Sequence, residues 1–364
     1  YRNPRTIRRR EPRFCSCDPI AFHRRLPGYE PTPLVDAPTI AERLGLARLT
    51  VKDESCRFGL PSFKLLGASW AIYRALVQRH GELEPWSSLE DISEKLSHLE
   101  PLTLAAATDG NHGRAVAHMA RLLGFGARVF VPAGTAAARI RAIEAEGAEV
   151  EIVDGDYDAT IRRSAREESR RCLVVDDTSW PGYEEIPRWV IEGYSTIFWE
   201  IDAQLDEAPN AVFVPLGVGA LGAAAADFFA SSERVRVIGV EPASAACVQA
   251  SLRAGQIVTI PGPHPSIMVG LNCGTPSSIA FPALQEGLDA CIAVADVDAE
   301  EAMRALAASG IVSGETGAAS LAGLQAVPRE QLSLGASSSV VVLCTEGATD
   351  PESYERIVGR SLPR

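Results

Sequence analysis

The stretch AVFVPLGVGALG, residues 211–222, joins an apolar run typical of a buried strand to a glycine-rich turn that opens a helix. Its glycines at positions 217, 219 and 222 have the spacing G-x-G-x-x-G. Such glycines let the backbone approach a phosphate, and the start of the following helix offers unpaired N–H donors. The stretch therefore predicts an α/β fold with a phosphate site at the carboxyl end of a strand, without indicating which phosphate compound binds there.

Apolar, β-branched segments alternate with segments of helical periodicity along most of the chain. This alternation predicts right-handed β-α-β crossovers and largely parallel sheets, so we expect two sheets with a cleft between them. The polar stretch 80–100 interrupts the pattern, and we interpret it as a helix–loop insertion on the surface. The predicted strands are residues 49–52, 102–106, 127–131, 149–153, 173–176, 212–216, 235–240 and 340–343, and the predicted helices are residues 65–77, 113–123, 136–146, 157–168, 186–201 and 222–229.

The composition argues against several classes of function. The 364 residues hold 35 Lys and Arg against 47 Asp and Glu, and a chain with a net charge of −12 repels nucleic-acid phosphates. No apolar run reaches the ~18 residues of a membrane span, so we expect no membrane partner. The arginine-rich N-terminus lacks the apolar segment of a secretory signal. We expect it to be a solvated arm on a chain that has been trimmed before Tyr1.

The eight cysteines are scattered, which is typical of a protein from the reducing cytoplasm. Only Cys15 and Cys17 lie close together in the sequence, and their spacing is not that of a metal site, so we expect no metal. Cys273 and Cys291 could meet in space, and the sequence leaves open whether they pair.

Two further segments carry side chains suited to catalysis. In PSFKLLGA, residues 61–68, Lys64 begins a helical stretch. The positive end of the helix dipole lowers the pKa of an amine there and frees it for imine chemistry, although such a lysine is often simply exposed. In TDGNHG, residues 108–113, the glycines and Asn111 shape a loop suited to a carboxylate or a ring hydroxyl. His112 could merely cap this loop, whereas the carboxylate of Asp109 in an anion-binding loop requires a functional reason.

The glycine-rich stretch by itself also fits a dinucleotide-binding fold. Glu241 ends the next predicted strand, about where such a fold has its ribose ligand. An NAD-binding oxidoreductase is therefore one interpretation, and a tight strand–helix turn without a ligand is another. The NAD interpretation leaves Lys64 and the Asn111 loop unexplained.

Taken together, the three loops resemble those of the fold type II pyridoxal-phosphate enzymes, in which Ser-x-Lys, Gly-Asn-His-Gly and a glycine-rich phosphate loop recur in this order. Within that family the chain is similar to the diaminopropionate ammonia-lyases. The resemblance covers nearly the whole chain, from residue 22 onward. It rests on residues 22–34 (FHRRLPGYEPTPL), 57–67 (RFGLPSFKLLG), 108–114 (TDGNHGR), 177–193 (DTSWPGYEEIPRWVIEG), 217–221 (GVGAL), 267–274 (IMVGLNCG), 313–318 (SGETGA) and 345–350 (TEGATD).

The resemblance implies two open, twisted, mostly parallel sheets with flanking helices, and pyridoxal phosphate in the cleft between two domains. Residues 1–70 and 185–364 would form a large cofactor-binding domain, and residues 71–184 a smaller domain with the Asp-Gly-Asn-His-Gly loop. It also implies a homodimer, and a smaller domain that closes over the substrate.

The resemblance further implies which residues hold the cofactor. Lys64, next to Phe63, would bind it as an imine, and Asn111 would hydrogen-bond the ring hydroxyl. Thr345 would face the pyridine nitrogen, where a hydroxyl, unlike a carboxylate, favours β-elimination over transamination. Glu241 would then have a structural role. The phosphate would bind the N–H groups of Gly217, Val218, Gly219, Ala220, Leu221 and Gly222.

The implied reaction is α,β-elimination of 2,3-diaminopropionate, D or L, to pyruvate and two molecules of ammonia. Asp109 and Asp177 would recognise the extra ammonium group, with Gly110 and His112 beside the substrate. Asp177 could equally be a turn or N-cap acid. Lys64 on one face and Asp109 on the other would remove the α-proton, so both enantiomers could react.

Three positions bear on the choice of substrate. Serine and threonine dehydratases of this fold generally have Ser where this chain has Asp109. Ser62 stands where the ammonia-lyases usually have Ala, and Gly222 adds a glycine to the phosphate loop. A serine or threonine dehydratase is therefore the first alternative, and a catalytically silent cofactor-binding protein is another.

Overall fold

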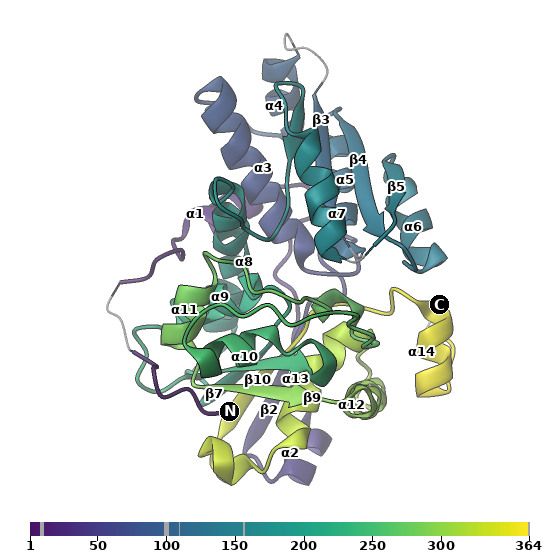
Figure 1. Ribbon diagram of the computed structural model, residues 1–364. Helices are drawn as coiled ribbons and strands as arrows, with labels where there is room; N and C mark the ends of the chain where they lie inside the picture. Colours follow the sequence, from purple (N-terminus) through teal and green to yellow (C-terminus); the bar gives the residue numbers. More distant parts are fainter. Residues whose placement is uncertain (8–10, 98–101, 109, 156, 363–364) are drawn as a thin grey trace.

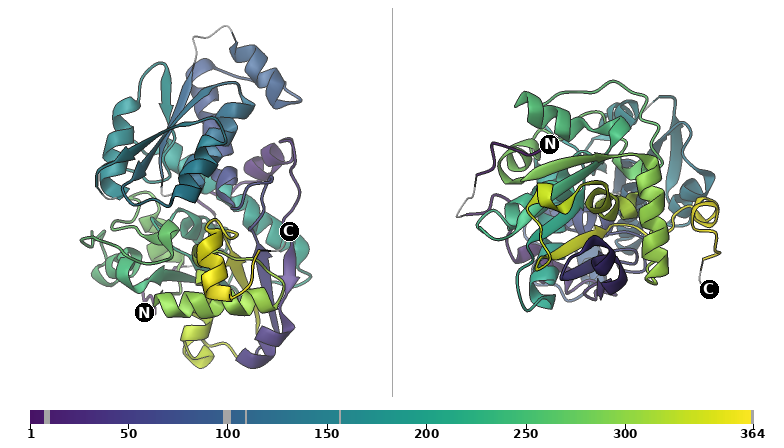
Figure 2. Two further views of the ribbon diagram at one scale, coloured as in Figure 1. Left: turned by 90° about the vertical axis from the view of Figure 1, so that its right-hand side faces the viewer. Right: turned by 90° about the horizontal axis from the view of Figure 1, so that it is seen from below.

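The computed structural model describes residues 1–7, 11–97, 102–108, 110–155 and 157–362. Two sheets, each flanked by helices, lie at opposite ends of the molecule (Figure 1). The view from the side in Figure 2 shows the same separation into two parts. The predicted α/β fold with two mostly parallel sheets is thereby confirmed.

The larger sheet has the strand order β1-β2-β10-β7-β8-β9. Neighbouring strands are parallel except for β1, which pairs antiparallel with β2. Its central strands are buried on both faces, which explains their continuous apolar sequences. The strands are β1 (Leu34–Asp36), β2 (Arg48–Asp53), β10 (Ser339–Cys344), β7 (Ala211–Pro215), β8 (Arg236–Pro242) and β9 (Ala290–Val294).

The smaller sheet is entirely parallel and has the order β5-β4-β3-β6. Its strands are β5 (Glu149–Val153), β4 (Gly126–Pro132), β3 (Thr103–Ala107) and β6 (Cys172–Val174). The division into residues 1–70 with 185–364 and residues 71–184 stays a prediction.

Helices cover the faces of both sheets (Figure 1). Those around the smaller sheet are α3 (Lys64–His80), α4 (Leu89–Leu96), α5 (Asn111–Leu122), α6 (Ala137–Glu144) and α7 (Tyr157–Ser164). The others are α1 (Asp18–His23), α2 (Pro38–Leu44), α8 (Glu185–Gln204), α9 (Ala220–Phe228), α10 (Cys247–Ala254), α11 (Phe281–Gly287), α12 (Asp296–Ala308), α13 (Glu315–Ala326) and α14 (Pro351–Val358).

Close packing of α3 on α8 fixes the position of the helix that begins at Lys64. A Cβ atom on Gly193 of α8 would lie 2.4 Å from the carbonyl oxygen of Leu66, so only glycine permits this approach. A Cβ atom on Gly67 of α3 would in turn lie 2.5 Å from the ring of Tyr194. The two glycines thus let the two helices touch through their backbones beside the start of α3.

Two expectations about surface segments hold only in part. The stretch 80–100 contains a helix, α4, next to loop segments, as expected, and many of its described residues are exposed, but Trp86 and one face of α4 (Leu89, Ile92 and Leu96) are buried. Of the arginine-rich N-terminus, residues 1–7 are not a solvated arm but lie against the larger half, and Arg8, Arg9 and Arg10 lie outside the described residues. Arg2 pairs with Ala290 of β9, and the buried Asn3 donates from Nδ2 to the carbonyl oxygen of Leu288 at 2.8 Å.

None of the eight cysteines forms a disulfide bond, so Cys273 and Cys291 do not pair. Among the described residues, no helix is long and apolar enough to cross a membrane. The same residues contain no cluster of His, Cys, Asp or Glu that could hold a metal ion.

Candidate active site

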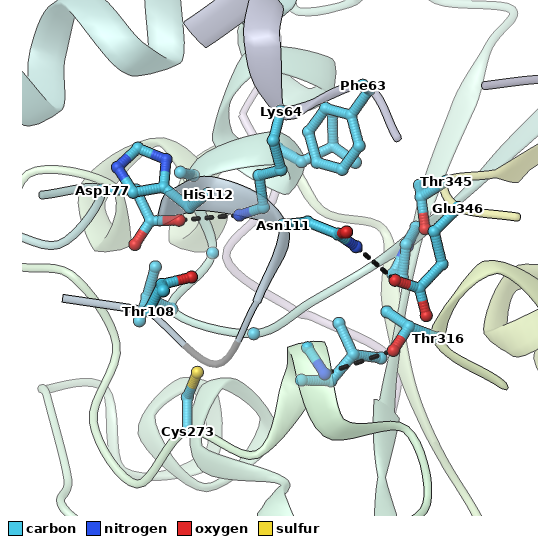
Figure 3. A pocket seen from close by; sticks show the side chains of 18 of the residues that line it. Phe63, Lys64, Thr108, Asn111, His112, Asp177, Cys273, Thr316, Thr345 and Glu346 are labelled. Carbon is cyan, nitrogen blue, oxygen red and sulfur yellow. Dashed lines mark hydrogen bonds and ion pairs between the residues drawn. The ribbon is translucent and has the colours of Figure 1, made fainter. Parts of the chain in front are cut away.

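The three loops singled out from the sequence meet in one pocket between the two sheets (Figure 3). Because the carboxyl ends of β3, β7 and β10 face this pocket, the segments that follow these strands form its walls. The start of α3 completes it. The predicted residues that line the pocket are Phe63, Lys64, Asn111, His112, Asp177, Gly217, Val218, Gly219, Ala220, Leu221 and Thr345.

Lys64 is the first residue of α3, and its amine points into the pocket (Figure 3). Its Nζ donates to Oδ2 of Asp177 at 2.7 Å, although 113 residues separate the two in sequence. The sequence holds three lysines, Lys52, Lys64 and Lys95. Lys52 is buried among polar acceptors, and Lys95 donates to the carbonyl oxygens of Leu83 and Pro85. Lys64 is therefore the lysine available for chemistry in this pocket.

The carboxylate of Asp177 is held by two side chains. Besides Lys64, the hydroxyl of Tyr157 donates to its Oδ1 at 3.1 Å. Burial alone would raise the pKa of Asp177, but the charge of Lys64 and the hydrogen bonds from Lys64 and Tyr157 hold it well below its usual range. Asp177 is thus an ionised group facing the pocket and is not the N-cap of a helix.

The pKa of the preceding residue, Asp176, is shifted in the opposite direction. Its buried carboxyl accepts from the N–H of Ala107 at 2.7 Å and from the hydroxyl of Ser164 at 2.6 Å. Burial raises the pKa of Asp176 to about 7, which the two hydrogen bonds only partly oppose. Asp176 connects the ends of two strands to α7 behind the pocket and does not line it.

His112 and Asn111 begin α5 and have different surroundings. Nε2 of the buried His112 donates to the carbonyl oxygen of Val175 at 2.6 Å, and Nδ1 has no hydrogen-bond partner among the described residues. Burial lowers the pKa of His112, so the neutral ring is favoured. Asn111 donates from Nδ2 to Oε2 of Glu346, across the pocket (Figure 3).

The glycine-rich loop forms a cradle at the start of α9. Gly219 is its N-cap with a φ of 97°, and a Cβ atom on Gly217 would lie 3.1 Å from the carbonyl oxygen of Gly270. The first N–H groups of α9 lack acceptors within the helix. Gly222 does not line the pocket. Its Cα packs instead against Leu216, and a Cβ atom on Gly222 would lie 2.2 Å from the side chain of Leu216. Gly110 lines a neighbouring pocket.

Several lining residues were missed by the sequence reasoning. Tyr194 comes from the middle of α8, where no local motif marks it. Thr316 could have been noticed only because it lies within the stretch SGETGA. Glu346 directly follows Thr345, so the strand end that predicted Thr345 could have indicated Glu346 too. The missed residues of the lining are Thr108, Tyr157, Tyr194, Pro215, Gly270, Leu271, Cys273, Thr316 and Glu346.

Glu241, the ribose ligand of the NAD interpretation, is engaged elsewhere. Its buried carboxyl accepts from the N–H groups of Val248 at 2.7 Å and Gln249 at 2.8 Å, at the start of α10. The thiol of Cys291 donates to the same carboxyl at 3.1 Å. Glu241 therefore has a structural role and is not placed to hold a ribose.

A family model described as pyridoxal-phosphate dependent enzyme matches residues 25–346. The chain belongs to this family. Its cofactor is therefore pyridoxal phosphate, and the NAD interpretation is wrong. Asp109, expected at the catalytic centre, lies outside the described residues.

Relatives of this pyridoxal-phosphate enzyme include two ammonia-lyases. The diaminopropionate ammonia-lyase of Escherichia coli K12 is 37% identical over 358 residues, which cover 93% of this chain and 89% of the relative. That of Salmonella typhimurium is 35% identical over 94% of this chain and 92% of the relative. The L-threonine dehydratase of Mycobacterium tuberculosis H37Rv is 29% identical over 94% of this chain and 73% of the relative. The crystal structure of the E. coli ammonia-lyase in complex with D-serine superposes with a TM-score of 0.90 at 34% identity, over 98% of this chain and 96% of that one.

The residues of the pocket fit this cofactor. Lys64 supplies an amine at the pocket, and the glycine cradle at the start of α9 leaves room for a phosphate. Thr345 is 1% exposed, and its Oγ1 has no hydrogen-bond partner among the described residues. A buried hydroxyl without a partner is costly, so a ring nitrogen is a fitting partner for it.

Proposed function

We propose that the chain catalyses the elimination of ammonia from 2,3-diaminopropionate, which with one water gives pyruvate and two molecules of ammonia. The 37% identity to the E. coli ammonia-lyase supports this assignment. The observation that carries it is the ionised carboxylate of Asp177, 2.7 Å from Lys64 Nζ inside the pocket. A substrate with a second ammonium group needs such a negative group beside the reacting carbon.

Pyridoxal phosphate supplies an aldehyde that condenses with amines and a ring that accepts the electrons released when the α-proton leaves. We assign Lys64 to hold its aldehyde carbon and the N–H groups of Gly217 to Leu221 to hold its phosphate. Asn111 would bind the ring hydroxyl, and Thr345 Oγ1 would bind the ring nitrogen. A hydroxyl at that nitrogen, unlike a carboxylate, would not keep it protonated, which would favour elimination over transamination.

Two groups are proposed to move the α-proton. Lys64 Nζ would accept it on one face of the substrate, and the carboxylate of Asp109 would accept it on the other. Either group can then give a proton to the departing β-amine, so that it leaves as ammonia. Each such transfer contributes about 10²–10⁴-fold to the rate.

Asp177 is proposed to bind the β-ammonium group of the substrate. Because its pKa is held low, it stays ionised over the working pH range. Tyr157 keeps one carboxylate oxygen fixed, and the other faces the amine of Lys64. L-Serine lacks the second ammonium and would gain nothing from this carboxylate.

The assignment is tested by comparing substrates. The purified holoenzyme is given D- and L-2,3-diaminopropionate, L-serine and L-threonine at equal concentration, and 2-oxo acid formation is measured. We expect kcat/KM to be highest for a diaminopropionate enantiomer. A higher value for L-serine or L-threonine would assign the chain to the dehydratases, represented by the 29% identical threonine dehydratase.

Replacing Asp109 with Asn tests the two-base scheme. We expect kcat for one diaminopropionate enantiomer to fall by about 10²-fold or more, because its α-proton loses its acceptor, and the other to fall far less. Initial rates on both enantiomers give the ratio directly. Equal losses on both enantiomers would contradict the scheme.

We further propose a cytoplasmic homodimer in which the smaller domain closes over the substrate. The family resemblance supports this arrangement, and size-exclusion chromatography with light scattering tests the dimer.

A further inference from the structure

A second pocket, with a volume of about 330 Å³, lies beside the active site. Its walls come from both halves of the molecule. Residues 55–61 and the segment after β10 form one wall, and the starts of α5 and α6 form the other. Asn111 lines both this pocket and the active site. Nothing in the proposed reaction uses this pocket, which we call the lateral pocket.

The charge of the lateral pocket is opposite to that of the chain. Arg114 and Arg139 both line it, and its described lining residues include no Asp or Glu, although the chain carries a net charge of −12. Glu146 pairs with Arg114 at 3.3 Å from outside the lining. At physiological ionic strength charges are screened over about 8 Å, so the local arginines decide which ligand the pocket attracts.

Arg139 has no ion-pair or hydrogen-bond partner for its guanidinium among the described residues, although the side chain is half-buried. Its stem packs on Gly110, where a Cβ would lie 3.1 Å from Cδ of Arg139. The side chain is thus fixed along its stem while its five N–H donors are left unused. Arg57, by contrast, is buried and donates to Glu54 and Glu200.

Thr349 presents a second unused group from the opposite wall. Its Oγ1 is buried and has no hydrogen-bond partner among the described residues. Thr349 from the larger half and Arg139 from the smaller half therefore both line one cavity, and each carries a donor without a partner among the described residues. A small oxyanion, which accepts several hydrogen bonds from such donors, satisfies both at once.

We propose that the lateral pocket binds a small oxyanion, a phosphate or a carboxylate, between Arg139 and Thr349. The bound anion joins the two halves of the molecule beside the Asn111 loop. Arginine is charged at all working pH values, so the site is always ready for an anion.

Calorimetric titration of the holoenzyme tests this site, because bound cofactor already fills the phosphate cradle of the active site. Inorganic phosphate is the first probe and malonate the second, both at constant ionic strength set with sodium chloride. We expect saturable binding of at least one of them, at one anion per chain. The stronger probe tells whether the site prefers a phosphate or a carboxylate.

Two variants and a matched control locate the binding. Arg139→Gln keeps most of the stem and removes the charge, so we expect affinity to fall at least about 10-fold, and Thr349→Val should weaken it about 5-fold. Arg166→Gln, at an exposed arginine that lines a different pocket, should bind like the wild type. Wild-type affinity in Arg139→Gln, or no saturable binding of either probe to the wild type, would overturn the proposal. Because binding is measured without turnover, this result is independent of the proposed reaction.

Discussion

Two lysines of this chain form ion pairs of equal length in different surroundings. Lys52 Nζ lies 2.7 Å from Glu200, and Lys64 Nζ lies 2.7 Å from Asp177. Lys52 is completely buried and also donates to the carbonyl oxygen of Thr32 and to Gln204, so all three of its protons are used. The side chain of Lys64 is 22% exposed and faces a pocket.

This difference separates a structural lysine from a chemical one. Burial lowers the pKa of Lys52 while Glu54 and Glu200 raise it, and no ligand can reach its amine. Lys64 begins a helix, where the dipole disfavours its charge, and its amine can be approached from the cleft. The length of an ion pair therefore says little about the role of its lysine. That role depends on whether a ligand can reach the amine and on how many fixed acceptors already bind it.

Removing the amine of Lys64 has the largest expected effect. In Lys64→Ala we expect the elimination rate to fall by about 10⁴-fold, because both the bond to the cofactor and one base are lost. The visible absorption band of the lysine-bound cofactor should disappear, and the denaturation midpoint should change little. An unchanged absorption spectrum would put the chemical lysine elsewhere.

Removing the amine of Lys52 should lower the stability of the fold and leave the cofactor's bond to Lys64 intact. Lys52→Met leaves the buried Glu200 with Arg57 as its remaining cation, so we expect the free energy of unfolding to fall by about 3 kcal/mol. Urea denaturation measures this change, and the cofactor band should persist in the folded variant. Arg48→Met, which breaks the exposed pair with Asp36, is the control and should cost less than about 1 kcal/mol. If the free energy of unfolding fell equally in Lys52→Met and Arg48→Met, the claim that the buried ion pair matters more for stability than the exposed one would be contradicted.

Replacing the partner of Lys64 sharpens the comparison. In Asp177→Asn we expect kcat/KM for 2,3-diaminopropionate to fall by about 10²-fold, as for loss of a charged hydrogen bond. The value for L-serine should change less, since serine has no second ammonium group. An equal loss on both substrates would mean that Asp177 acts only by positioning Lys64.

The neighbouring carboxyl gives a smaller effect that depends on pH. The pKa of Asp176 is raised to about 7 in the folded chain, so the folded state binds more protons than the unfolded state between pH 4 and 7. Stability from this group is present at low pH and is lost as pH rises through 7, by about 2 kcal/mol between pH 5 and 7. Asp176→Asn should flatten the difference between denaturation curves at these two pH values. A variant with the same pH dependence as the wild type would contradict this assignment.

The strands and the three loops could be predicted because their signals are local. Each loop follows an apolar run or opens a helical pattern, and parallel strands bring their carboxyl ends to one edge. The buried face of α4 in the stretch 80–100 was not predicted, because the exposed residues around it make the segment polar on average. β1 and β9 were not predicted, and for β1 the reason is that a strand of only three residues has almost no pattern.

The site residues that lie next to a glycine motif were predicted from the sequence. Those that come from distant helices were missed. The approach of Tyr194 to Lys64 depends on the packing of α8 on α3 through Gly67 and Gly193, which no local pattern encodes. The opposite environments of Asp176 and Asp177 are equally hidden, because adjacent residues leave a strand end in different directions.

The central claim is that Lys64 carries the cofactor. The most direct test is to reduce the holoenzyme with sodium borohydride, digest it, and find the modified lysine by mass spectrometry. With three lysines in the sequence, we predict that the pyridoxyl group is found on Lys64. Its presence on Lys52 or Lys95, or on no lysine, would contradict the account.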